Sequence, residues 1–164
     1  MLFRSKINVG PSGTGVPQLF DKLLSANGVS PQRVKLTRME NTPATVALLA
    51  GKIDGMVFSS SAEGLIIQML LQTPGIRLFN FSQADAYARR FPFLSAVRLP
   101  RGIVDLGREI PSRDFQLIAP TATLVGRENL HPALIDLFVE AAAEVHGGPG
   151  WFQRRGDFPN ANFT

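Results

Sequence analysis

The residues best suited to chemistry in this 164-residue sequence form a glycine-rich loop near its start. Residues 7–9 predict the end of a short strand, and residues 10–15 contain three glycines, a proline and two hydroxyl side chains. The apolar pattern of a helix follows at once. Glycines let the backbone approach a ligand, and the first N–H groups of a helix lack internal partners, so the stretch is typical of an anion site. A capped turn that binds nothing is the alternative interpretation.

The motifs of known catalytic and nucleotide-binding loops do not fit this stretch. A P-loop needs a lysine and a hydroxyl residue after its second glycine, but Thr14 and Gly15 follow Gly13. The loop also lacks the dinucleotide fingerprint, and Ser12 lacks the Gly-x-Ser-x-Gly spacing of a hydrolase. His131 and His146 are explained by the ends of one helix, Asp54 by a turn, and no acidic cluster has metal-ligand spacing. We therefore expect no catalytic residue, no metal, no cofactor and no enzymatic activity.

The composition is that of an ordinary globular chain, with 45% apolar and 18% charged residues and no cysteine. A net charge of +4 raises the question of nucleic acid, but the arginines are scattered and form no basic stripe. No apolar run reaches the ~18–20 residues of a membrane helix. We expect neither a nucleic-acid partner nor a membrane span in this chain.

Strand and helix patterns alternate along most of the sequence. Strands are expected at residues 7–9, 34–37, 56–58, 76–81 and 97–99, with one long strand or two short ones at 115–125. Helices are expected at 16–26, 43–50, 62–71, 83–90 and 132–146. Thr42 is expected to cap the second helix, with Pro43 in its first position. This order predicts an α/β fold with a mostly parallel sheet and helices on both faces.

Two loops of small residues follow strands of this sheet. Ligands of such sheets bind beyond the carboxyl ends of the strands, which places both loops on one edge. We therefore predict ligand contacts from the first loop and from the serines after the strand at 56–58. The candidate ligand-binding residues are Ser12, Gly13, Thr14, Ser59 and Ser60. A helix cap with two surface serines is the alternative for the second loop.

Five stretches together resemble the TAXI branch of the substrate receptors of tripartite ATP-independent periplasmic (TRAP) transporters. They are residues 9–14, 47–55 with its Gly-Lys-Ile-Asp-Gly turn, 84–94, 99–102 and 130–134. The resemblance implies a periplasmic binding protein-like II fold, in which two lobes close on a ligand. Residues 7–125 would form the second lobe, and residues 126–164 the return segment, the C-terminal helix and an irregular tail.

The resemblance also implies a function. The chain would bind a small organic anion such as an amino acid or a dicarboxylate, and would deliver it to membrane permease subunits. The expected location is the periplasm, with the signal peptide outside this chain. A lone lobe should bind its ligand weakly because enclosure supplies most of the affinity. A homodimer through the surface that the absent lobe would cover is a further expectation.

Two other functions remain open at this stage. The effector-binding domain of a transcription regulator uses the same lobe architecture, although this chain shows no helix-turn-helix. An enzyme on this fold is the other, against which the absence of cysteine and the sparse acid–base residues argue.

Overall fold

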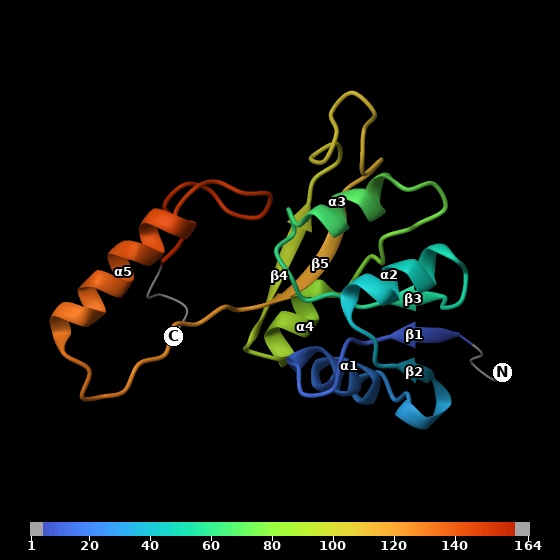
Figure 1. The fold of residues 1–164 in the computed structure, drawn as a ribbon, viewed down its shortest axis with the longest axis horizontal. Helices are drawn as coiled ribbons and strands as arrows, with labels where there is room; N and C mark the ends of the chain where they lie inside the picture. The colour runs from blue at the N-terminus through green and yellow to red at the C-terminus, as the bar shows by residue number, and fades with distance from the viewer. Residues whose placement is uncertain (1–4, 160–164) are drawn as a thin grey trace. The chain divides into compact units, whose positions relative to one another are not determined.

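The structure is a computed structural model that describes residues 5–159. The chain forms two compact units, the first ending at Ser60 and the second beginning at Ser61. Figure 1 labels the helices and strands of both units. The boundary predicted at residues 125 and 126 stays a prediction, since it concerns the lobes of a larger receptor.

The first unit is built on a three-stranded parallel sheet. Its strands lie in the order β2 (Lys35–Thr37), β1 (Lys6–Asn8) and β3 (Gly55–Met56). One further hydrogen bond extends each ladder: Val9 N donates to Thr37 O over 3.1 Å, and Val57 N donates to Asn8 O over 2.8 Å. The central strand β1 is therefore paired along both of its edges.

Two helices and a short 3-10 helix connect these strands. The chain runs from β1 through α1 (Gly15–Ala26) and η1 (Pro31–Arg33) to β2, and then through α2 (Asn41–Leu49) to β3. The two crossovers run in opposite directions across the sheet, and such connections are right-handed, so α1 and α2 cover opposite faces. Val9, Ala44 and Ile53 form the core at 0–4% exposure. The predicted α/β class with a parallel sheet is confirmed.

The start of α2 differs from the prediction. Glu40, not Thr42, occupies the N-cap, and the helix begins at Asn41. Pro43 therefore stands in the third helical position rather than the first. A proline is tolerated throughout the first turn because none of those N–H groups has a partner inside the helix. Pro43 marks the first turn without specifying which residue begins it.

The second unit contains the remaining elements. They are α3 (Leu65–Gln72), α4 (Ala84–Arg90), β4 (Leu94–Leu99), β5 (Phe115–Pro120) and α5 (Pro132–His146). β4 and β5 pair antiparallel from Leu94–Pro120 to Leu99–Phe115, and α4 packs on both strands. The core of this unit is small, and its largest buried side chains are Leu70, Leu94, Leu99 and Phe115.

Two strand predictions for this unit are corrected, and the direction of the last two strands is defined. Residues 76–81 form no strand. The segment's hydrogen bonds to β5 run from Phe81 N to Gln116 O and from Gln116 N to Asn80 Oδ1, each over 2.8 Å. β5 ends at Pro120 rather than at residue 125. The last two strands are antiparallel because residues 100–114 contain no helix, and a parallel pair needs a crossover connection, usually helical.

The long helix α5 matches its predicted bounds. His131 caps it, since its Nδ1 accepts a hydrogen bond from Ala133 N over 3.2 Å. No residue of α5 is buried. Across residues 5–159, no helix combines the length and apolar character needed to cross a membrane.

Carboxylates order the connection between β4 and β5. Asp114 accepts hydrogen bonds from the backbone N–H of Arg101, over 2.8 Å, and from the guanidinium of Arg98. Arg101 also pairs with Glu109. The Arg101 N–H, followed by the Arg98 guanidinium, holds the pKa of Asp114 below its ordinary value. The ionised Asp114 carboxylate therefore favours the ordered connection.

Acidification should release this connection. A lowered pKa means that the contribution of Asp114 is fully present above the ~3.9 of an unstructured aspartate and disappears as the pH falls through its lower folded value. Amide NMR of Arg101 between pH 7 and pH 2 should show a transition below that ordinary value, and Asp114→Asn should remove the transition. An Arg101 amide that titrates identically in the variant would contradict this role.

Candidate ligand-binding rim

The carboxyl ends of β1, β2 and β3 lie at one edge of the sheet because the three strands are parallel. Residues 9–14, 38–40 and 57–60 leave the strands at this edge, which we call the rim. The chain leaves β1 toward β2 on one side and returns to β3 on the other. The position between β1 and β3 is therefore the switch point, where open α/β sheets bind their ligands.

The loop after β1 depends on two glycines in the left-handed region. Gly10 has φ 78° and is buried, and Gly13 has φ 89° and is exposed. Residues with a Cβ atom rarely adopt this conformation. A Cβ atom on Gly13 would meet nothing within 4 Å. The glycine at this position is thus required by the backbone angle and leaves open space beside it.

The loop leads directly into α1, whose N-cap is Thr14. Of the two caps that the sequence allows, Thr14 and Gly15, the structure has Thr14, whose side chain makes no capping hydrogen bond. Its hydroxyl instead donates to Pro11 O over 2.9 Å, which closes the loop on itself. The N–H groups of Gly15 and Val16 have no acceptor inside the helix. The start of α1 therefore offers backbone donors, and Thr14 supports the loop that presents them.

The second predicted loop leaves the neighbouring strand. Ser59 and Ser60 are exposed and follow β3, which is hydrogen-bonded to β1. The structure thus brings Ser12, Gly13 and Thr14 to one side of the switch point and the two serines to the other. Contact between these residues and a ligand stays a prediction.

A buried amide, overlooked in the sequence analysis, supports the third segment of the rim. Asn8 is 0% exposed, and its side-chain nitrogen donates to Met39 O over 3.1 Å. Its Oδ1 accepts from Met39 N over 2.8 Å and from the Thr37 hydroxyl over 3.2 Å. The available signal was a polar residue between two apolar ones, in a strand expected to be buried.

Asp54 and two polar residues of the second unit make structural contacts. Asp54 accepts from Lys6 N over 2.7 Å at the amino end of β1, which confirms it as a turn residue. In the second unit, the Glu63 carboxylate accepts from Trp151 N over 2.9 Å, and His146 packs edge-on against Phe158. Within residues 5–159, no group of three or more His, Asp and Glu side chains is arranged to hold a metal ion.

Residues 2–145 match the sequence profile of the NMT1-like family. The chain belongs to this family. The NMT1-like family is part of the group of solute receptors with a periplasmic binding protein-like II fold. Membership agrees with the parallel α/β sheet and supports a solute-binding function in general terms. No curated protein matches the chain.

Replacing Gly13 by alanine should destabilise the first unit through the backbone alone. A left-handed alanine costs about 1 kcal/mol, and the open space around Gly13 removes any steric contribution. Gly15→Ala is the matched control, because Gly15 opens α1, lies outside the left-handed region and has the same open surroundings. The control should be neutral or stabilising by up to about 1 kcal/mol in urea unfolding. Equal losses in both variants would refute the conformational role of Gly13.

Proposed function

We propose that this chain is the ligand-binding part of a solute receptor of the TAXI branch, serving a TRAP-type transporter. It captures a small organic anion such as an amino acid or a dicarboxylate and passes it to the membrane permease subunits. The location we propose is the periplasm. The chain binds its ligand without chemical change and is not an enzyme.

One observation carries this proposal: two loops of small residues flank the switch point between β1 and β3. The first supplies backbone N–H groups from the start of α1, and the second supplies the hydroxyls of Ser59 and Ser60. Oriented N–H groups and hydroxyls are donors that suit a carboxylate, and the dipole of α1 favours negative charge at its start. Membership in the NMT1-like family supports the same class of function.

The side chains on the rim favour binding over catalysis. Residues 9–14, 38–40 and 57–60 contain no histidine, cysteine or lysine, and Glu40 is their single carboxylate. The serines of the rim have no histidine within these segments to activate them. The groups on the rim therefore suit the binding of a ligand better than catalysis.

The proposal is tested by NMR titration of the chain with sodium succinate at millimolar concentrations, with succinamide as the uncharged control. We expect the amides of Gly13, Gly15 and Val16 to shift with succinate only, and Asp54 at the opposite edge to stay unchanged. Binding should be far weaker than micromolar because the loops of the rim are exposed to solvent and do not enclose a ligand. Equal shifts with both compounds, or none at the rim, would count against the proposal.

We also propose that this chain forms a homodimer in solution. The support is the apolar side of α5, on which Leu137 is 60%, Phe138 53% and Val145 71% exposed. Clusters of such side chains commonly mark association surfaces. Multi-angle light scattering should give twice the mass of one chain, and an unchanged monomer mass across a concentration series would exclude the dimer.

A further inference from the structure

The segment after β2, residues 38–40, is held at the rim by two hydrogen bonds to the backbone of Met39. The buried Asn8 amide bonds to both the N–H and the C=O of Met39, at 2.8 Å and 3.1 Å. The Thr37 hydroxyl supplies the second hydrogen bond to the Asn8 Oδ1. An isolated loop has no such constraint, so the backbone of residues 38–40 is fixed before any ligand arrives.

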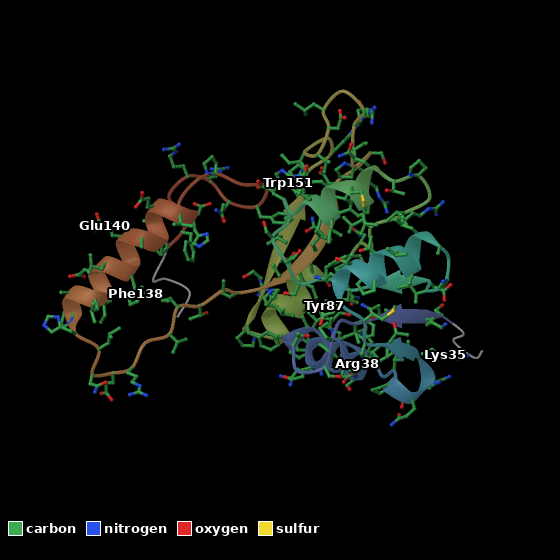
Figure 2. All side chains as sticks on the ribbon, in the orientation of Figure 1. Lys35, Arg38, Tyr87, Phe138, Glu140 and Trp151 are labelled. Carbon is green, nitrogen blue, oxygen red and sulfur yellow. The ribbon has the colours of Figure 1, made fainter. Side chains whose placement is uncertain are left out.

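Two opposite charges, Arg38 and Glu40, lie on either side of Met39 in this segment. Arg38 and Glu40 are both exposed, and within the described chain neither forms an ion pair or a side-chain hydrogen bond. They are the charged residues of the three rim segments. Figure 2 shows Arg38 at the opposite end of β2 from Lys35, which places Arg38 at the rim. The rim thus offers one unpaired cation and one unpaired anion.

We propose that residues 38–40 make the rim selective for a zwitterionic amino acid over a dicarboxylate, with Asn8 as the residue that positions them. The Arg38 guanidinium pairs with the carboxylate, for which its planar fork of donors is suited. Glu40 pairs with the ammonium group, an attraction that a dicarboxylate such as glutarate lacks. This inference rests on the proposed function, because residues 38–40 belong to the same rim and follow β2, the strand on the other side of β1 from β3.

L-Glutamate and glutarate are the probes that test the selectivity, because they differ only in the ammonium group. In NMR titrations the wild-type chain should bind glutamate about fivefold more tightly, the range of an exposed charge pair. Glu40→Gln should abolish this preference. Arg38→Gln should weaken both probes about fivefold for the same reason.

Matched controls separate these effects from a general change of charge. Lys35→Gln removes a cation at the opposite end of β2, and Asp21→Asn removes an acid in the middle of α1. Both controls should leave the two affinities unchanged. Equal wild-type affinities, or a preference that survives Glu40→Gln, would overturn the inference while leaving the rim as a site. Absence of rim shifts with either probe would overturn the proposed function as well.

The positioning role of Asn8 is tested without ligand by hydrogen exchange. Asn8→Ala should accelerate exchange of the Met39 amide, which loses its acceptor, far more than that of other amides in the first unit. Ile53→Val is the control, because Ile53 is buried in the same unit but precedes β3 at the opposite edge. Asn8→Ala should also reduce the preference for glutamate. If Met39 is affected no more than in the control, or the preference persists, Asn8 does not position this segment.

Discussion

The hydrogen bonds along both edges of β1 are the constraint on which the rim depends. β1 pairs with β2 on one side and with β3 on the other, and both ladders continue one residue beyond the strands, through Val9 and Val57. Because all three strands run in one direction, their carboxyl ends meet at one edge. Without this pairing, residues 9–14, 38–40 and 57–60 would be three unrelated loops.

Polar groups around β1 divide into those that build the rim and those that face outward from it. The Asn8 side chain forms hydrogen bonds with the backbone of Met39, and the Thr14 hydroxyl donates one to the backbone of Pro11. The start of α1 and the side chains of Arg38 and Glu40 remain exposed. Such a division is typical of binding sites, because a fixed backbone lowers the cost of ordering the groups that meet a ligand. It supports recognition of a small charged molecule.

The sequence predicted helices and strands correctly where local signals sufficed. The bounds of α5 and its cap at His131 were predicted because a proline, a cap and a long apolar period coincide. The positions of α1 and β2 followed from similar signals. The apolar residues at 76–81 led to a wrong strand prediction, because strand formation needs a partner strand along its length. This segment instead hydrogen-bonds to β5 through Phe81 and Asn80. The antiparallel pairing of β4 and β5 was left open by the sequence for the same non-local reason.

By itself, the sequence determined the α/β class, the glycine loop before α1 and the serines after β3, because strand, turn and helix signals are local properties of the chain. Only the tertiary structure decided that β1 is the central strand and that the two loops flank one switch point. It also decided that Asn8 is buried and holds Met39 across 31 residues of chain. Strand order and buried hydrogen bonds depend on which distant residues meet, and that choice belongs to the packing of the whole unit.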